Sequence, residues 1–286
     1  MSKHTWENVP TQTVNVNGVT YAYRQLGTGD VPVIFLHHLM AVLDDWDPEI
    51  INGIATQHKV IAFDNKGVGS TEGVTPNSID QMAIDAISFI QALGFNKVDL
   101  LGFSMGGGVA QSIALQAPDL VRRIVLAGTG PKGGGGIERI NKVAISAYLK
   151  AVLTLSDPRN FLFFPRTKEG RRAAKAYLTR LKQRSFNRDK RISWQSRIAQ
   201  LQAIKSAGLS QPDDLSKMTQ PVFIANGDND LMVDSSLSLD LANRIPNSKL
   251  SIYPDSGHGG VFQYYDTFLS ETLAFLDNQN STTSVK

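Results

Sequence analysis

The chain has 286 residues, enough for one large domain or for a core domain with an insertion. With 42% hydrophobic residues, 19% charged residues and a formal net charge of +3, its composition is that of a soluble globular protein. No cysteine is present, which excludes disulfides and thiolate metal sites, and no apolar run suits a signal peptide or a membrane helix, so we expect a cytoplasmic protein with no membrane span.

Strand and helix patterns alternate along the first part of the chain, which favours a mostly parallel sheet with helices on both faces. Two alternating segments joined at Asn17-Gly18 predict a hairpin, because this dipeptide is typical of tight turns. The clearest helix begins at a capping box of Ser78 and Gln81 and stops at Gly94. The predicted elements are the strands Thr13–Val16, Thr20–Arg24, Val31–Leu36, Lys59–Phe63, Lys97–Phe103 and Arg123–Ala127, and the helices Ser78–Leu93 and Met105–Gln116.

The second part of the chain begins with a long basic segment of helical pattern. From Glu138 to Ala207 the strand pattern is absent, and residues 131–216 contain 18 Lys or Arg and 6 Asp or Glu. Strand patterns return at Val222–Ala225 and Lys249–Tyr253. An interruption of this length is too long for a loop, so we predict an inserted helical domain. The predicted domains are a core of residues 1–130 and 217–286 and a helical lid of residues 131–216.

Gly102-Phe103-Ser104-Met105-Gly106 is a G-x-S-x-G sequence between a predicted strand and a predicted helix. A serine on so sharp a turn is held in a strained backbone conformation, and side chains two residues to either side would collide with neighbouring elements. The turn exposes the hydroxyl and leaves the N–H of Met105 at the helix N-terminus, where an oxyanion is stabilised. We therefore predict that Ser104 is a nucleophile; the alternative is a structural serine in a Gly-rich turn.

A serine nucleophile needs a base that titrates near neutrality, and the chain has five histidines. We expect His4 and His58 to be exposed, while His37 and His38 precede the nucleophile at the end of a strand. His258 follows a late strand and lies downstream of a suitable acid, as the chain order nucleophile, acid, base requires. We predict that His258 is the general base; the alternative is a loop histidine bonded to backbone.

Two aspartates compete to orient this histidine at the end of the strand Val222–Ala225. Asp230, the third residue after Gly227, suits a turn that points its carboxylate toward the histidine. Asp228 would more naturally support the turn by capping it. We predict Asp230, and Asp228 stays open as the alternative.

Over nearly its whole length the chain resembles the α/β-hydrolase superfamily. The matching pieces are Leu36–His38, Phe63–Ser70, Gly102–Gly106, Gly227–Asp230 and Ser256–His258. The resemblance implies the α/β-hydrolase fold, with an eight-stranded sheet, a helical lid inserted after the sixth strand, and a Ser–Asp–His triad. A serine at the turn argues against the haloalkane dehalogenase and epoxide hydrolase branches, which attack with a carboxylate.

The sequence departs from the family in one loop. After the third strand the family usually has His-Gly, whereas this chain has His37-His38-Leu39-Met40. Carried over by the resemblance, the N–H groups of Leu39 and Met105 form an oxyanion hole. His38 restricts the backbone and brings an imidazole near the pocket mouth, either as a substrate contact or as a histidine bonded to the loop backbone. The Met105 side chain is a second candidate for substrate contact.

No cofactor or metal is expected. A metal site of His37 and His38 with Asp44 or Asp45 is disfavoured, because adjacent strand side chains face opposite ways. The glycines of residues 128–136 lack the lysine of a phosphate-binding loop, so nucleotide binding has little support. No basic motif with interleaved aromatic residues supports nucleic-acid binding. Trp46 is assigned to packing, with a pocket wall as the alternative.

We predict a carboxylic ester hydrolase that acts on a small-molecule acyl substrate through an acyl-enzyme, as a monomer or homodimer. The same triad would serve perhydrolysis, as in cofactor-free haloperoxidases, or cleavage of a lactone, amide or C–C bond. A ligand receptor on a hydrolase fold is the alternative from a different class. The basic lid residues are interpreted first as a solvated helix face, with steering of an anionic ester or binding to acidic surfaces as alternatives. They are Arg166, Lys168, Arg171, Arg172, Lys175, Arg180, Lys182, Arg184, Arg188, Lys190, Arg191 and Arg197.

Overall fold

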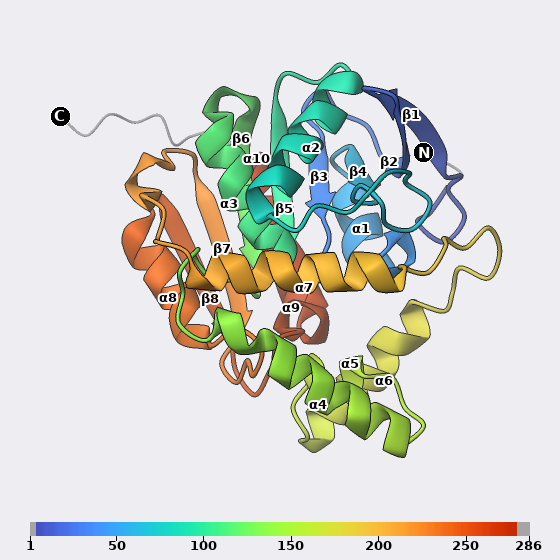
Figure 1. The fold of residues 1–286 in the computed structure, drawn as a ribbon, viewed down its shortest axis with the longest axis vertical. Coiled ribbons are helices and arrows are strands. Elements are labelled where there is room, and N and C mark those ends of the chain that lie inside the picture. The colour runs from blue at the N-terminus through green and yellow to red at the C-terminus, as the bar shows by residue number, and fades with distance from the viewer. Residues whose placement is uncertain (1–3, 279–286) are drawn as a thin grey trace.

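The structure is a computed structural model that describes residues 4–278, apart from the side chains of residues 141 and 148. Its centre is an eight-stranded sheet in the order β1-β2-β4-β3-β5-β6-β7-β8 (Figure 1). β2 pairs antiparallel with β1 and β4, and the remaining neighbours pair parallel. The expected mostly parallel sheet is confirmed. The strands are β1 (Gln12–Val16), β2 (Val19–Leu26), β3 (Val33–Leu36), β4 (Val60–Phe63), β5 (Val98–Phe103), β6 (Val121–Ala127), β7 (Val222–Gly227) and β8 (Ser248–Tyr253).

The inner strands β3, β4, β5 and β7 are buried along their whole length, which explains their unbroken apolar runs. The predicted hairpin forms between β1 and β2, where Asn17 and Gly18 both have positive φ, 52° and 85°. Val31 was expected in a strand but lies outside β3. The reason is Pro32, which has no N–H to donate to a neighbouring strand.

Helices cover both faces of the sheet. In Figure 1, α2, α3 and α8 lie in front of it, and α1 and α10 pack together behind it. Ser78 caps α2 by accepting from the N–H of Gln81, but the Gln81 side chain donates to Asp85, so the capping box is only half formed. The α-helices are α1 (Pro48–Ala55), α2 (Ile79–Ala92), α3 (Met105–Gln116), α4 (Ile140–Leu153), α5 (Arg159–Leu162), α6 (Lys168–Arg180), α7 (Trp194–Leu209), α8 (Ser235–Arg244), α9 (Gly260–Gln263) and α10 (Tyr265–Asp277). Short 3-10 helices span Leu43–Asp45, Pro118–Leu120, Ile137–Arg139 and Leu215–Lys217.

The basic segment of residues 131–216, called the inserted segment below, lies between β6 and β7 and contains α4 to α7. It contains no strand, as its sequence pattern predicts. In Figure 1, α7 crosses the lower end of the sheet, and α4, α5 and α6 lie beyond it. The division of the chain into a core and a lid domain stays a prediction.

Two ion pairs, one buried and one half-buried, join the inserted segment to the loop after β3. Arg180 donates to both carboxylate oxygens of Asp47, at 2.8 and 2.6 Å, and the Asp47 side chain is fully buried. Arg159 donates to Asp45 at 2.7 Å. The expectation of a solvated basic face is therefore wrong for Arg180, because its charge is held by a carboxylate of the core.

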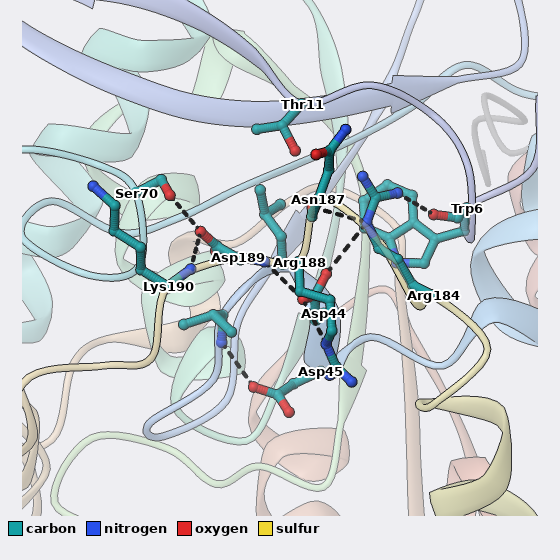
Figure 2. Close-up of polar contacts among 12 residues, drawn as sticks. Trp6, Thr11, Asp44, Asp45, Ser70, Arg184, Asn187, Arg188, Asp189 and Lys190 are labelled. Atoms are coloured by element: carbon teal, nitrogen blue, oxygen red, sulfur yellow. Dashed lines mark hydrogen bonds and ion pairs between the residues drawn. The ribbon is translucent and has the colours of Figure 1, made fainter.

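A second junction centres on Asp44 (Figure 2). One carboxylate oxygen of Asp44 accepts from Arg188 at 3.3 Å and from the backbone N–H of Asp189 at 2.8 Å. Arg184 is buried beside it and donates to the carbonyl oxygen of Trp6 at 3.1 Å. Because Trp6 belongs to the N-terminal segment, three distant parts of the chain meet here.

Candidate active site

The parallel register brings the carboxyl ends of several strands to one edge of the sheet. Leu36 of β3 lies opposite Gly102 of β5, and Gly227 of β7 lies opposite Tyr253 of β8. The loops that follow these strands carry the predicted site residues, so the register places them together. This edge is where ligands bind in open α/β sheets.

Ser104 lies on a sharp turn between β5 and α3. Its φ of 56° and ψ of −118° fall in a region that side chains avoid, so the turn is strained. A Cβ atom at Gly102 would collide with the carbonyl of Gly106, and one at Gly106 would collide with the carbonyl of Leu36. The steric explanation for both glycines of the motif is confirmed.

The structure brings Ser104, His258 and Asp230 into one chain of hydrogen bonds. Nε2 of His258 lies 2.9 Å from Oγ of Ser104, and Nδ1 lies 2.7 Å from Oδ2 of Asp230. Oδ1 of Asp230 accepts from the N–H groups of Met232 and Val233, at 2.8 and 2.9 Å. All three site residues are buried. In this arrangement the Nδ1 proton is donated to the carboxylate, which leaves Nε2 to accept the serine proton.

Asp228 has a different position from Asp230. Its carboxylate accepts from the backbone N–H of Ser256 at 3.1 Å and from the side-chain amide of Asn229 at 2.8 Å. The N–H of Asn229 in turn donates to the carbonyl of Ser256 at 2.9 Å. Asp228 therefore supports the loop that carries His258, whereas the sequence suggested that it caps its own turn.

The loop after β3 places His38 beside the serine. Nδ1 of His38 lies 2.9 Å from the carbonyl oxygen of Leu39, and the ring packs edge-on against Phe103 and Phe163. Burial lowers the pKa of His38 to about 3, with a further contribution from the positive charge of Arg159. A neutral His38 donates from Nδ1 to Leu39, and its Nε2 is a buried acceptor with no partner among residues 4–278.

The two alternatives for His38 thus describe different nitrogen atoms of one ring. Nδ1 is bonded to the loop backbone, while Nε2 is left to contact a substrate. His38 itself does not have a positive φ, and the positive φ of this loop falls on Met40, at 64°.

Two cavities meet at Ser104. A narrow cavity of about 60 Å³ has a mostly apolar surface and is bounded by Met105 and by residues of α3 and α7. A wide cavity of about 640 Å³ is bounded by His38, His258 and charged residues of the inserted segment. Ser104 and Leu39 border both, so a bound molecule can reach into either side of the serine.

Sequence reasoning missed Phe163. Its carbonyl oxygen accepts from the N–H of Gly259 at 2.7 Å, and its ring centre lies 5.5 Å from that of His258. The ring also packs against Phe103 and Phe262. The aromatic run around Phe163 was the available signal, but it lies in a segment whose pattern indicated helices alone.

The remaining histidines and Trp46 lie outside the hydrogen-bonded chain at Ser104. Trp46 is buried against Phe35 and His37, as the packing alternative predicts, and burial lowers the pKa of His37 to about 4. His58 is largely buried beside Asp277 and not exposed as expected, while His4 is exposed.

Within residues 4–278, no three metal-ligating side chains come together, and no helix is long and apolar enough to cross a membrane.

Comparisons with known proteins identify relatives over most of the chain. The model of the alpha/beta hydrolase fold family matches residues 31–263. A solved alpha/beta hydrolase fold protein from Chitinophaga pinensis is 38% identical, with a TM-score of 0.92, over 96% of this chain and 100% of that one. The putative non-heme bromoperoxidase BpoC of Mycobacterium tuberculosis is 26% identical, over 90% of this chain and 97% of its own. The bifunctional esterase/perhydrolase DCH of Acinetobacter calcoaceticus is 25% identical, over 91% and 97%.

Proposed function

Because the chain belongs to the alpha/beta hydrolase fold family, we propose that it is a serine hydrolase that cleaves carboxylic esters through an acyl-enzyme. The observation that carries the proposal is the continuous chain of hydrogen bonds from Ser104 through His258 to Asp230, at 2.9 and 2.7 Å. The strained turn of Ser104 supports it further, since strain at a polar residue is typical of functional sites.

In the proposed mechanism, Oγ of Ser104 attacks the ester carbonyl while Nε2 of His258 takes the hydroxyl proton. Asp230 holds the imidazole in the required tautomer and stabilises the imidazolium that forms. The N–H groups of Leu39 and Met105 bind the oxyanion, a role supported by the place of Met105 as first residue of α3. His258 then gives its proton to the leaving alcohol, and a water molecule repeats the sequence on the acyl-enzyme.

Two side chains are proposed to contact the substrate. Met105 borders the narrow cavity, where its thioether can pack against an apolar group. His38 borders the wide cavity, where Nε2 can accept a hydrogen bond from a substrate or from a water molecule. Neither role needs His38 to be charged.

Perhydrolysis is a second candidate, favoured by two relatives whose names are bromoperoxidase and esterase/perhydrolase. In that reaction hydrogen peroxide replaces water in the attack on the acyl-enzyme and releases a peracid. Both reactions use the same acyl-enzyme, so a panel of esters with and without peroxide separates them. A ligand receptor on this fold would turn over the esters neither with nor without peroxide.

The decisive experiment compares the parent protein with Ser104→Ala on short p-nitrophenyl esters. We expect the rate to fall by a factor on the order of 10⁴–10⁶, because the variant lacks the nucleophile. A fluorophosphonate probe should label the parent rapidly at Ser104 and leave the variant unlabelled. Equal rates for the two proteins, or a parent that resists the probe, would show that the proposed mechanism is wrong.

A further inference from the structure

The two cavities at Ser104 differ in how their charges are paired. The charged residues that border the narrow cavity are Asp80, Lys132 and Asp213, and Lys132 pairs with both aspartates at 2.9 and 3.5 Å. The wide cavity is bordered by four arginines and four aspartates, all of them from the inserted segment or from the loop after β3. They are Arg159, Arg188, Arg191, Arg197, Asp44, Asp45, Asp157 and Asp189.

The aspartates of the wide cavity are already engaged. Asp45 and Asp157 both bind Arg159, each at 2.7 Å. Asp44 binds Arg24, an arginine buried behind the cavity wall, at 2.7 Å, in addition to Arg188. The negative charges of these three aspartates are therefore paired with Arg24, Arg159 and Arg188.

Asp189 has hydrogen-bond partners but no cationic partner within ion-pair distance among the described residues. It accepts from the hydroxyl of Ser70 at 2.6 Å and from its neighbour's backbone N–H at 2.7 Å. Within the part of the chain that the structure describes, no carboxylate lies within ion-pair distance of Arg191 or Arg197. The second carboxylate oxygen of Asp189 is buried and has no partner there. Three charged residues of the wide cavity therefore lack an ion-pair partner among residues 4–278, the cations Arg191 and Arg197 and the anion Asp189.

Arg197 is held in place by the first turns of α7. The hydroxyl of Ser196 donates to the carbonyl of Gly67 at 2.7 Å, and the side-chain oxygen of Gln200 accepts from the N–H of Met40 at 2.7 Å. Ser196 and Gln200 are both buried. Because these bonds join α7 to core loops, the backbone position of Arg197 is fixed relative to the core. Arg197 is half-buried, and Arg191, which borders the same cavity, is exposed.

The position of His258 decides which part of an ester occupies each cavity. In the mechanism above, the leaving alcohol receives its proton from Nε2 of His258, and of the two cavities His258 borders the wide one. The alcohol part then lies in the wide cavity beside the arginines. The acyl part lies in the narrow cavity, which is the smaller and the more apolar of the two.

We propose that Arg191 and Arg197 form an anion-binding subsite, and that the preferred substrate is an ester of a short apolar acid with an alcohol that carries a carboxylate. The planar fork of an arginine matches a carboxylate, and charge-assisted hydrogen bonds of this kind are stronger than neutral ones. The inference rests on the proposed esterase function, because the direction of the substrate follows from that mechanism.

The test compares two esters that differ by one charge, the butyrate ester of 4-hydroxybenzoate and the butyrate ester of methyl 4-hydroxybenzoate. The ratio of their kcat/KM values cancels effects common to both. We expect the parent to prefer the carboxylate ester, and Arg191→Gln/Arg197→Gln to lower the ratio by about tenfold or more, chiefly through the KM of the charged ester.

The matched control is Arg172→Gln/Lys175→Gln. It removes the same charge from exposed positions of α6, so the long-range field changes while the cavity keeps its arginines. We expect the control to keep the ratio of the parent. An equal fall in both double variants, or a ratio that stays unchanged without Arg191 and Arg197, would overturn the subsite.

Failure of the subsite and failure of the esterase proposal give different results. A parent that hydrolyses both esters in a Ser104-dependent way but prefers the neutral one contradicts the subsite alone. A parent that hydrolyses neither contradicts the esterase proposal. In that case the subsite is tested by calorimetric titration of Ser104→Ala with the two esters. Tighter binding of the carboxylate ester, lost when both arginines are replaced, would support the subsite. Equal binding of the two esters would refute it.

Discussion

Asp230 and Asp228 stand two residues apart on one turn, yet their carboxylates serve different partners. Asp230 faces the imidazole of His258, whereas Asp228 holds the backbone N–H of Ser256. The order of residues on the turn favoured Asp230, but both aspartates could be placed there from the sequence. To tell the two roles apart, the position of the His258 loop is needed, and this loop follows another strand, β8.

Asparagine at each of the two positions tests the difference. We expect Asp230→Asn to lower kcat/KM by a factor on the order of 10⁴, because an amide no longer holds the required tautomer of His258. Asp228→Asn keeps an oxygen that accepts from Ser256, so its loss should be under about tenfold, in line with a single neutral hydrogen bond. Steady-state kinetics on one ester measure both. Equal losses would contradict the assignment of the acid.

At the scale of the element, α3 shows how a sterically constrained position differs from its neighbours. The helix begins with Met105 and three glycines, Gly106 to Gly108. A Cβ atom at Gly106 would collide with the backbone carbonyls of Leu36, the last residue of β3, and of His37. At Gly108 the nearest neighbour of such an atom is a methyl group of Ile79 at 3.7 Å, an ordinary contact.

Alanine at these two positions should have opposite effects on stability. We expect Gly106→Ala to lower the free energy of unfolding by about 2 kcal/mol or more, because backbone must shift to admit the methyl group. Gly108→Ala should raise it by up to about 1 kcal/mol through helix propensity. Urea unfolding measures both changes. A stable Gly106→Ala protein would refute the steric explanation of the motif.

The elements themselves were predictable because each is marked locally. Apolar runs, the Asn17-Gly18 turn and the stop at Gly94 lie within the segments that they define. The ends of strands were less predictable, since Gly227 joins β7 only through its pairing with β8. The role of Phe163 was not predictable, because it depends on contact with a loop almost a hundred residues later in the chain.

At the scale of the whole molecule, ion pairs join the inserted segment to the core. The excess of basic residues in residues 131–216 was visible in the sequence, but their partners were not. Arg180 and Asp47 are separated by 133 residues. Burial raises the pKa of Asp47, while its hydrogen bonds with Arg180 act in the opposite direction.

Removing Arg180 should therefore cost more than removing an ordinary surface arginine. We expect Arg180→Met to lower the free energy of unfolding by about 3–5 kcal/mol, because it leaves the Asp47 carboxylate buried and unpaired. Arg172→Met, at a side chain that is 83% exposed, should change it by no more than about 0.5 kcal/mol.

The double variant Asp47→Asn/Arg180→Met checks the cause. It removes the unpaired charge, so part of the lost stability should return. Chemical denaturation at neutral pH compares all the variants with the parent. If the double variant were no more stable than Arg180→Met, the lost stability would come from the packing of Arg180 against Tyr265 and not from the charge.

The bond between Gly259 and Phe163 has a consequence for the surroundings of the base. A displacement of Phe163 would break this bond and withdraw an aromatic ring from His258. The hydrogen bonds of His258 to Asp230 and Ser104 do not involve Phe163, so they would not be broken directly. Phe163 borders the wide cavity together with His258, so a single residue of the inserted segment shapes both the cavity and the apolar cover of the base.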